Sequence, residues 1–255
     1  MNDSWINYRK SQFSEFQKFL ETTQGTQELT PNKQKKLFWE RGVESTSWFE
    51  RDKIAIGLIQ RLIIPNHSKK KIKIASVGCS RGQEPYSILT NNWDIKEKLE
   101  IHGYDINPSN IKAAKAGKYE NNVFEVIHAM PPKELCSKYT ENKSFTFKKQ
   151  IREMIQFNVH DIFEKPLPKK YDSIFMLYVM QHYTYEGREI ILSNLSKSLN
   201  PGGWIICETY NNTVHNVGKA NVANPQRFSL EKITDPRLEA DYGHYKEIPQ
   251  VYRKI

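Results

Sequence analysis

Short runs of β-branched and apolar residues alternate along this chain with longer stretches in which apolar residues recur at helical spacing. The pattern predicts strands at 72–78, 99–106, 154–159, 171–179 and 204–209, and helices at 83–92, 108–117 and 185–199. The last helix is expected to end at Pro201-Gly202-Gly203, which turns the chain into the next strand. Strands that alternate with helices in this way indicate an α/β domain.

Two segments depart from this alternation. Residues 1–65 repeat apolar positions at helical spacing, with Phe13 and Phe16 on one face, and predict a helical N-terminal segment that could cover a ligand cleft. Residues 121–153 show no strand–helix repeat and indicate an inserted subdomain with a short helix and a small β piece. The main domain of this prediction is 70–255.

The composition is that of one domain without a membrane anchor. The chain has 255 residues, enough for a single large α/β domain with a core. Its most apolar stretch, Ile174 to Met180, is too short to span a bilayer, and the first ten residues contain no apolar run typical of a signal peptide. The three cysteines have no zinc-module spacing and argue against a disulfide framework. We expect a cytoplasmic protein without membrane insertion.

The net charge of +9 raises the question of a nucleic-acid partner. The lysines are scattered, and the one tight cluster, Lys69-Lys-Lys-Ile-Lys73, directly precedes a predicted strand, where a solvated linker explains it. No aromatic–basic RNA-binding motif accompanies the cluster. We therefore expect no nucleic-acid partner, whereas an acidic protein surface or an anionic small substrate would use the same charge.

The most informative segment is a glycine turn between the first predicted strand and its helix. Gly78-Cys-Ser-Arg-Gly82 lets the backbone approach a ligand closely, because glycine has no Cβ. The next predicted strand ends in Asp105, 23 positions after Gly82. A carboxylate at the tip of the second strand is where an α/β nucleotide fold binds two ribose hydroxyls. Together the turn and the carboxylate indicate a ligand of the adenosine type.

A second carboxylate narrows the choice of ligand. The turn lacks the third glycine of a dinucleotide motif, and no P-loop lysine follows it. Glu84 stands at the start of the helix instead, where it would repel a pyrophosphate but would suit a cation. S-adenosylmethionine carries a sulfonium, an amino group and no phosphate, so the charges favour it.

Cys79-Ser-Arg-Gly-Gln-Glu-Pro-Tyr-Ser87 resembles the Ser/Thr-Gly-Glu-Glu-Pro-Tyr-Ser signature of the chemotaxis-receptor glutamate methyltransferases, the CheR type. The resemblance continues through Gly103-Tyr-Asp-Ile-Asn107 and Leu199-Asn-Pro-Gly-Gly-Trp204 to Val251-Tyr-Arg-Lys254, and covers roughly residues 45 to 255. It implies a class I Rossmann-like methyltransferase sheet with a helical N-terminal segment, a small inserted β-subdomain and S-adenosylmethionine as cofactor.

The resemblance also implies roles for individual residues. Glu84 would face the methionine amino group, Asp105 the ribose hydroxyls and Ile106 the adenine face. Asp161 and Ile162 follow the third strand, where this fold presents an acceptor to the adenine amino group. The alternative for Asp161 is a role as an N-cap or turn residue. The other residues assigned to the cofactor are Thr46, Gly78, Cys79 and Tyr178.

The acceptor side departs from the family. Where the chemotaxis enzymes have Thr-x-Phe-Phe-Arg, this chain has Thr46-Ser-Trp-Phe-Glu-Arg51, with Glu50 at the place of the arginine and Arg51 one position late. The loop after the fourth strand places His182 where the family has a tyrosine. Catalytic or substrate roles are assigned to Arg51, His182 and Tyr183, and core packing competes with such a role for each aromatic residue.

These features leave three hypotheses for the function. The family signature and the insert favour methyl transfer from S-adenosylmethionine to a protein carboxylate, the side chain of a glutamate. Glu50 and His182 favour instead an N- or O-methyltransferase of small molecules. A non-catalytic S-adenosylmethionine sensor is the third hypothesis. Both enzymatic hypotheses require a methyl acceptor, either a protein carboxylate or a small molecule, as the partner of this chain.

Overall fold

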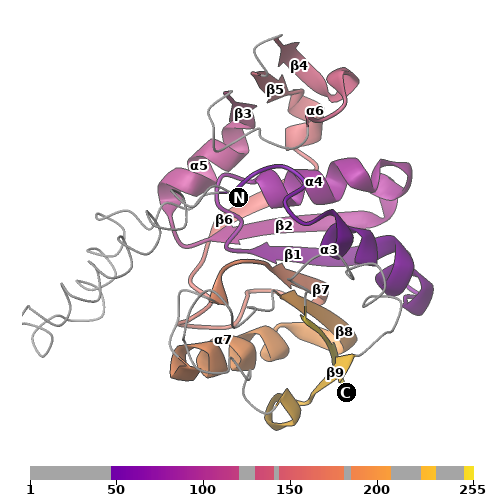
Figure 1. Cartoon of the computed structure of the whole chain (residues 1–255), viewed down its shortest axis with the longest axis vertical. Coiled ribbons are helices and arrows are strands. Elements are labelled where there is room, and N and C mark those ends of the chain that lie inside the picture. Colours follow the sequence, from indigo (N-terminus) through magenta and orange to yellow (C-terminus); the bar gives the residue numbers. More distant parts are fainter. Residues whose placement is uncertain (1–46, 121–129, 141–143, 181–184, 208–224, 234–249) are drawn as a thin grey trace, which may run out of the picture. The chain divides into compact units, whose positions relative to one another are not determined.

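The computed structural model describes residues 47–120, 130–140, 144–180, 185–207, 225–233 and 250–255 (Figure 1). All of them belong to one compact unit, Thr46–Ile255. Residues 1–46 of the expected helical segment, 1–65, lie outside the described residues. The part of it that is described, 47–65, includes a short α-helix, α3, at Lys53–Leu58.

The larger elements of the unit follow the predicted alternation. The strands of the main sheet are β1 Ile72–Val77, β2 Leu99–Asp105, β6 Ile155–Val159, β7 Tyr171–Met176, β8 Leu199–Cys207, β9 Leu230–Ile233 and β10 Gln250–Lys254. The α-helices after α3 are α4 Gln83–Asn91, α5 Pro108–Ala116, α6 Lys149–Arg152 and α7 Tyr185–Lys197. Shorter helical turns lie at Ile59–Ile63, Ile64–Asn66, Trp93–Lys98, Lys133–Leu135 and Pro225–Phe228.

The described strands form a seven-stranded sheet in the order β6-β2-β1-β7-β8-β10-β9. Neighbouring strands from β6 to β8 pair in parallel, and β10 runs antiparallel to both β8 and β9. Figure 1 shows α4 and α7 on opposite sides of this sheet. The side chains of β1 divide in the same way, because Ile72 and Ile74 join the core with α3 and α4 whereas Ala75 and Val77 join the core with α7. Both faces of the central strands are therefore buried, as a parallel sheet requires.

The junction between α7 and β8 differs from its prediction. The helix ends at Lys197, before the Pro-Gly-Gly turn, and β8 begins at Leu199. Ser198 is the reason: its hydroxyl donates to Asn194 O at 2.6 Å, and its carbonyl accepts the Tyr171 N–H at 2.9 Å, which draws the chain into the sheet. The Pro-Gly-Gly residues then lie in an irregularity of the β7–β8 pairing.

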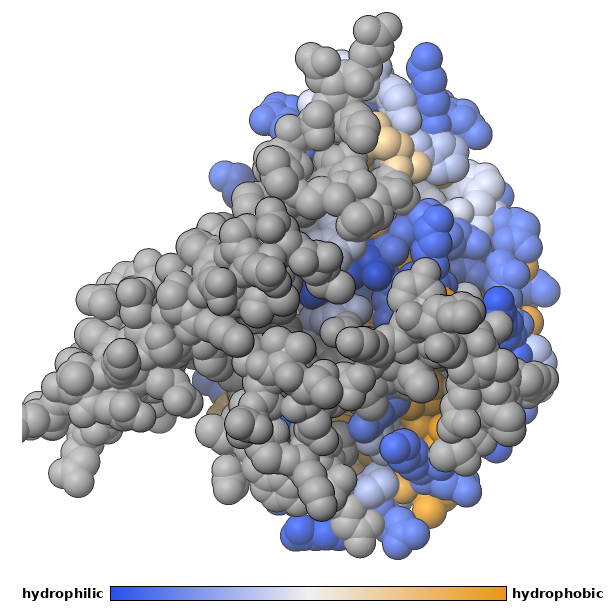
Figure 2. Space-filling model, viewed as in Figure 1, coloured by the Kyte–Doolittle hydropathy of each residue, from blue (hydrophilic) through white to orange (hydrophobic). Residues whose placement is uncertain are grey.

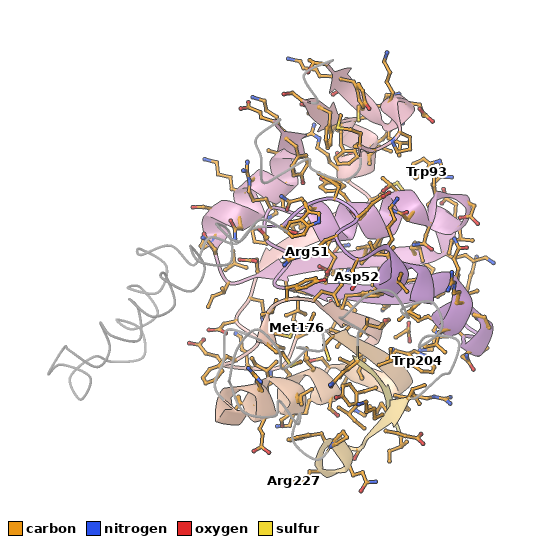
Figure 3. All side chains as sticks on the ribbon, in the orientation of Figure 1. Arg51, Asp52, Trp93, Met176, Trp204 and Arg227 are labelled. Carbon is orange, nitrogen blue, oxygen red and sulfur yellow. The ribbon has the colours of Figure 1, made fainter. Side chains whose placement is uncertain are left out.

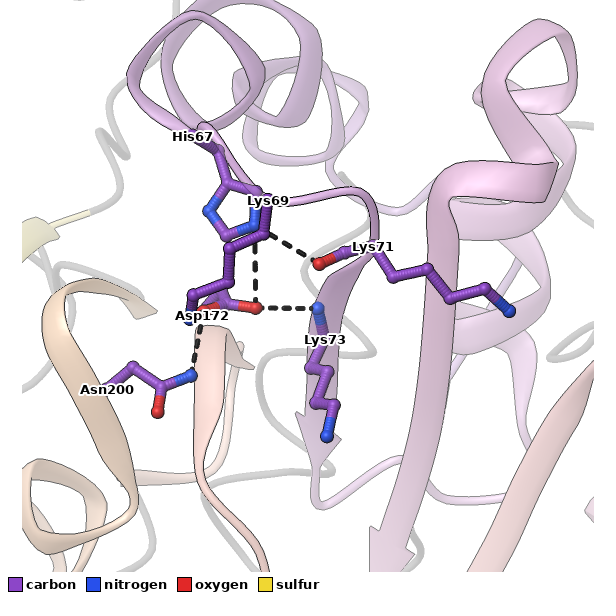
Figure 4. Close-up of polar contacts among 6 residues, drawn as sticks. All are labelled: His67, Lys69, Lys71, Lys73, Asp172 and Asn200. Carbon is purple, nitrogen blue, oxygen red and sulfur yellow. Dashed lines mark hydrogen bonds and ion pairs between the residues drawn. The ribbon is translucent and has the colours of Figure 1, made fainter.

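Asp172 at the start of β7 connects three parts of the chain at this end of the sheet (Figure 4). Its carboxylate accepts hydrogen bonds from Lys69 Nζ at 2.8 Å, the Lys73 N–H at 2.9 Å and Asn200 Nδ2 at 2.7 Å. Burial by itself would raise the pKa of Asp172, but these donors outweigh it and hold the pKa below its ordinary value. The carboxylate thus fastens β1 and β8 to β7.

A small separate sheet stands between α5 and β6 in the chain. Its strands are β3 Lys118–Tyr119, β4 Cys136–Tyr139 and β5 Phe145–Phe147, in the order β3-β5-β4. It begins at Lys118, three residues before the predicted insert, and residues 121–129 and 141–143 within it lie outside the described part. Phe147 stacks on Tyr86 of α4 with ring centres 4.3 Å apart, so the small sheet shares a core with the helix that follows the glycine turn.

The surface in view is mainly hydrophilic over the described residues, with apolar residues confined to small areas (Figure 2). None of the described helices has the length and apolar character that a membrane span needs.

Candidate active site

The glycine turn lies at the carboxyl end of β1, between the ends of β2 and β7. The N–H groups of Gly78 and Cys79 donate to Tyr104 O at 2.8 and 3.0 Å. Gly78 has φ +72°, and a Cβ there would lie 2.4 Å from Val179 Cγ2, beyond the end of β7. A side chain at this position would therefore be strained and would also collide with the neighbouring loop. The turn needs its glycine for both reasons.

The ring of Phe157, in β6, packs directly against Gly82 and Gly103. A Cβ on Gly82, which has φ +92°, would lie 3.1 Å from the Phe157 ring, and a Cβ on Gly103 would lie 2.5 Å from it. The Cys79 side chain is buried in the same place, 2% exposed, so that only the backbone of this residue can face a ligand. Burial and the carboxylates of Asp105 and Glu84 raise the pKa of the Cys79 thiol well above its usual range, which excludes it as a nucleophile.

Asp105 stands at the tip of β2, as predicted, and is 6% exposed. One of its oxygens accepts the Ser80 N–H at 2.8 Å, and the other accepts the Asn107 N–H at 2.8 Å and Asn110 Nδ2 at 3.2 Å. Burial raises the pKa of Asp105, while these three donors oppose the shift. The bonds fix the orientation of the carboxylate beside the turn, which is what recognition of a ribose diol requires.

Glu84 lies in the first turn of α4 and is half-buried. Its Oε1 accepts a hydrogen bond from Ser76 Oγ at 2.7 Å. Burial raises the pKa of Glu84 from an ordinary 4.5 to about 7, and the nearby Asp52 carboxylate adds to this rise. The hydrogen bond from Ser76 and the Arg51 cation both lower the pKa, but they do not outweigh burial. This carboxylate has too little positive charge around it, and a ligand ammonium group would supply the missing charge.

Arg51 lies in the segment before α3 (Figure 3), and its positive charge acts on the Glu84 carboxylate. Its guanidinium carbon lies 3.5 Å from the centre of the Tyr178 ring and 4.2 Å from that of Trp48. Tyr178 adopts φ +62°, an uncommon conformation for a residue with a side chain. The next residue, Asp52, caps α3 by accepting the Ala55 N–H at 2.8 Å, which fixes the chain directly after Arg51.

Glu50 is turned away from this cluster. Its carboxylate contacts Lys53 Nζ at 2.5 Å and accepts a hydrogen bond from Asn91 Nδ2 at 3.1 Å, and its N–H donates to Ser87 Oγ at 2.9 Å. The backbone of Glu50 has φ +54°. The arginine that comes one position late in the sequence, Arg51, and not Glu50, therefore contacts Tyr178.

The remaining predicted site residues differ in their surroundings, and some lie outside the described residues. Ile106 is half-buried beside Asp105. Asp161 accepts the Phe163 N–H at 2.9 Å, the turn role that competed with adenine recognition, and the Ile162 side chain packs in the core with α7. Thr46, His182 and Tyr183 lie outside the described residues.

A family comparison bears directly on these residues. The model of the CheR methyltransferase, SAM binding domain, matches residues 44–225, which include the glycine turn, both carboxylates and Arg51. The chain belongs to this CheR family. The matched domain is the one that binds S-adenosylmethionine, which confirms the predicted family and cofactor.

Individual CheR relatives are distant. Chemotaxis protein methyltransferase 1 of Pseudomonas aeruginosa is 27% identical over 176 residues, 63% of each chain. The chemotaxis protein methyltransferase of Listeria innocua is 24% identical over 197 residues, 75% of this chain and 71% of that one. The chain thus spans less than two thirds of the length of the Pseudomonas relative.

A solved structure agrees with the fold. The TehB-like SAM-dependent methyltransferase of Corynebacterium glutamicum has a TM-score of 0.51 at 17% identity, covering 79% of this chain and 87% of that chain. With the seven-stranded sheet, this likeness confirms the expected class I Rossmann-like fold.

The described residues fit the CheR cofactor. Asp105 offers oriented oxygens to a diol, Glu84 offers a carboxylate that lacks charge compensation, and the backbone approaches closely at Gly78. Three contributors were not predicted: Ser76 and Ser80, which hold the two carboxylates, and Phe157, which supports the glycines. Ser76 precedes Gly78 by two residues and had no motif to mark it, while Phe157 is more than fifty residues away in the sequence.

Proposed function

We propose that the chain is an S-adenosylmethionine-dependent methyltransferase that esterifies a glutamate side chain of a protein. The observation that carries the proposal is the CheR family match over residues 44–225, which coincides with the turn and the two carboxylates described above. The names of its relatives, chemotaxis protein methyltransferases, support a chemotaxis receptor as the acceptor. The enzyme would work in the cytoplasm, where the thiols of Cys79, Cys136 and Cys207, none of them in a disulfide, would stay reduced.

S-adenosylmethionine supplies the activated methyl group, so the protein has mainly to bind and orient the reactants. Asp105 would accept hydrogen bonds from the ribose hydroxyls. Glu84 would bind the amino group, and Ser76 holds the Glu84 carboxylate for that contact. A carboxylate acceptor is already ionised near neutral pH, because its ordinary pKa is about 4, and needs no general base.

Arg51 is the group that would orient the acceptor carboxylate. Its guanidinium lies near Glu84 and therefore near the amino-acid end of the proposed cofactor position. The guanidinium carbon lies 3.5 Å from the centre of the Tyr178 ring and 4.2 Å from that of Trp48, so the two rings restrict where the cation can lie. A guanidinium held in this way can present two N–H groups to one carboxylate. His182 and Tyr183 remain proposed members of the same side of the site.

One argument for a small-molecule acceptor loses its basis in this geometry. Glu50 suggested that the acceptor site lacks an arginine, yet its carboxylate is engaged by Lys53 and Asn91, and Arg51 stands beside Tyr178 instead. Residues 49–52 form turns before α3, so the expected helical N-terminal segment, 1–65, is not helical throughout. We further propose that its preceding part is helical and that the insert at 121–153 is the small β-subdomain of this enzyme.

The product of the reaction distinguishes the acceptor classes. The full chain is incubated with S-adenosylmethionine carrying a radioactive methyl group and with the cytoplasmic part of a chemoreceptor from the same organism. A glutamate methyl ester releases volatile methanol in mild base, so the label transferred to the receptor should become volatile. Base-stable label on the receptor would reject the carboxyl acceptor, and cofactor binding without transfer to any receptor would favour the sensor hypothesis.

A further inference from the structure

The edge of the main sheet opposite the cofactor turn carries a row of lysines. The parallel strands β2, β1 and β7 each begin directly after a lysine, and β8 begins two residues after one. The antiparallel strand β10 ends in a lysine at the same end of the sheet. In the spatial order of the strands these lysines are Lys98, Lys71, Lys170, Lys197 and Lys254. Because neighbouring strands lie about 4.8 Å apart, the row is about 20 Å long. We call these five residues, together with Lys69, Lys70, Lys169 and Arg253, the basic edge.

Contacts between the described residues connect one half of the row, from Lys170 to Lys254. Lys170 Nζ donates to Lys197 O, and Lys254 Nζ donates to Ser196 O at 2.7 Å and to Leu199 O at 3.4 Å. Burial and the neighbouring Lys170 cation together lower the pKa of Lys254. The ammonium groups of Lys170 and Lys254 therefore lie close together, at the carbonyl groups where α7 ends and β8 begins.

Only part of this charge is neutralised within the chain. Lys69 pairs with Asp172 at 2.8 Å, and Lys169 lies 3.8 Å from Glu100. Figure 4 shows Lys69 turned onto Asp172 while the Lys71 side chain extends away from it. Lys70, Lys98 and Lys197 are exposed, and their ammonium groups form no ion pair in the part of the chain that the structure describes. The basic edge therefore retains a surplus of exposed positive charge.

We propose that the basic edge binds the surface of a lipid bilayer that contains anionic phospholipids. Flexible lysines spread over a row are suited to a diffuse layer of negative charge, where each contributes about a fivefold gain in binding. This interaction is adsorption to the surface and needs no apolar segment in the bilayer.

Other macromolecules fit this edge less well. Protein interfaces are depleted in lysine and are anchored by aromatic and arginine side chains, whereas the exposed cations here are almost all lysines. Phosphate pockets for nucleic acids are commonly built from N–H groups at helix N-termini, and α4 and α5 begin at the opposite edge, after the carboxyl ends of β1 and β2. The described residues of the basic edge also present no exposed aromatic ring on which a base could stack.

Membrane binding through this edge would orient the enzyme. The glycine turn and Asp105 lie at the carboxyl ends of β1 and β2, and the basic edge lies at their amino ends. A strand of six residues is about 20 Å long, so the cofactor site would face away from the bilayer at about that distance.

The test uses the full chain and sedimentation with two kinds of vesicle, one of phosphatidylcholine alone and one with about a third phosphatidylserine. The variant carries Lys70→Glu, Lys98→Glu and Lys197→Glu. Its matched control carries Lys112→Glu, Lys115→Glu and Lys138→Glu, three exposed lysines away from this edge. Thermal unfolding of both variants verifies that they fold, and a Lys→Gln version of the triple variant is the substitute if charge reversal prevents folding.

The proposal is supported if the protein binds only the anionic vesicles and if salt weakens this binding. The triple variant should then bind about 100-fold or more weakly, and the control should lose much less affinity. Equal losses in variant and control would overturn it, since net charge and not the basic edge would then decide binding. No difference between the two vesicle types would also overturn it. Binding of an oligonucleotide through the three lysines, without vesicle binding, would assign the edge to nucleic acid instead.

Discussion

The guanidinium carbon of Arg51 lies 3.5 Å above the centre of the Tyr178 ring, although the two residues are far apart in the sequence. Arg51 precedes α3, and Tyr178 follows β7 with φ +62°. A cation on a partly desolvated aromatic face gains about 1–2 kcal/mol. The contact therefore links the acceptor side of the proposed site to the loop after the fourth parallel strand.

Tyr178→Ala should release Arg51 and lower kcat/KM for the acceptor by about 10-fold, in keeping with the strength of such a contact. Tyr178→Phe retains the ring face and should stay close to the wild type. Steady-state methyl transfer at saturating cofactor measures both variants. If Tyr178→Phe loses as much activity as Tyr178→Ala, the hydroxyl group matters and the contact with the ring face does not.

Arg51→Lys keeps the charge but loses the planar group that two rings enclose. We expect its KM for the acceptor to rise by about 10-fold while the affinity for S-adenosylhomocysteine, measured by calorimetry, changes less than about twofold. An equal loss of cofactor affinity would mean that Arg51 holds the carboxylate of the cofactor and not that of the acceptor.

The raised pKa of Glu84, about 7, predicts how ligand-free stability depends on pH. In the unfolded chain this carboxyl titrates near its ordinary 4.5. Between these values the folded state binds more protons than the unfolded state, so stability falls as the pH rises from about 4.5 to about 7. Glu84→Gln should remove this decline, by up to about 3 kcal/mol, in urea titrations at several pH values.

The same carboxyl predicts the pH dependence of cofactor binding. A ligand ammonium group requires ionised Glu84, so the affinity for S-adenosylhomocysteine should increase as the pH rises through about 7 and then level off. Ser76→Ala removes the hydrogen bond that lowers the pKa of Glu84 and should move this rise to higher pH. An unchanged profile in Ser76→Ala would show that another group controls it.

Gly78→Ala tests the turn. The added Cβ would meet Val179 Cγ2 at 2.4 Å and would force alanine into φ +72°, so we expect a loss of about 1–3 kcal/mol of stability together with weaker cofactor binding. Gly57→Ala is the matched control, because Gly57 lies within α3 and a Cβ there has no neighbour within 4 Å. That substitution should stabilise the protein by roughly 0.5–1 kcal/mol. Thermal and urea unfolding measure both variants, and effects of the same sign would show that the Val179 contact and the positive φ do not decide the stability at Gly78.

Asp105→Ala should weaken S-adenosylhomocysteine binding by about 1–3 kcal/mol, since two ribose hydroxyls would lose their charged partner. The substitution also strands the buried Ser80 N–H, so unfolding without ligand must be measured beside the calorimetry. A folded Asp105→Ala protein with unchanged affinity would remove the central residue of the cofactor site.

The features that the sequence determined by itself are those set by local physics. Alternation of strand and helix patterns located β1, β2, β6 and β7 to within a few residues. The glycine turn and the acidic strand tip, on which the proposed cofactor site rests, also lie where the sequence predicted them, because positive φ and strand ends have narrow residue preferences. The position of Glu84 could also be predicted from the sequence, because the glycine turn marks the start of the helix that carries it. The end of α7 was misplaced, because Pro201 marked the latest possible stop whereas pairing with β7 through Tyr171 ended the helix earlier.

The tertiary structure alone decided which side chains meet. Whether Glu50 or Arg51 would enter the site depended on contacts with Asn91 and Tyr178, both far along the chain. The basic edge exists only because the strand order brings lysines from five separate segments side by side, and in the sequence the same lysines look scattered. Such features depend on packing between distant segments, and no local preference of the residues records that packing.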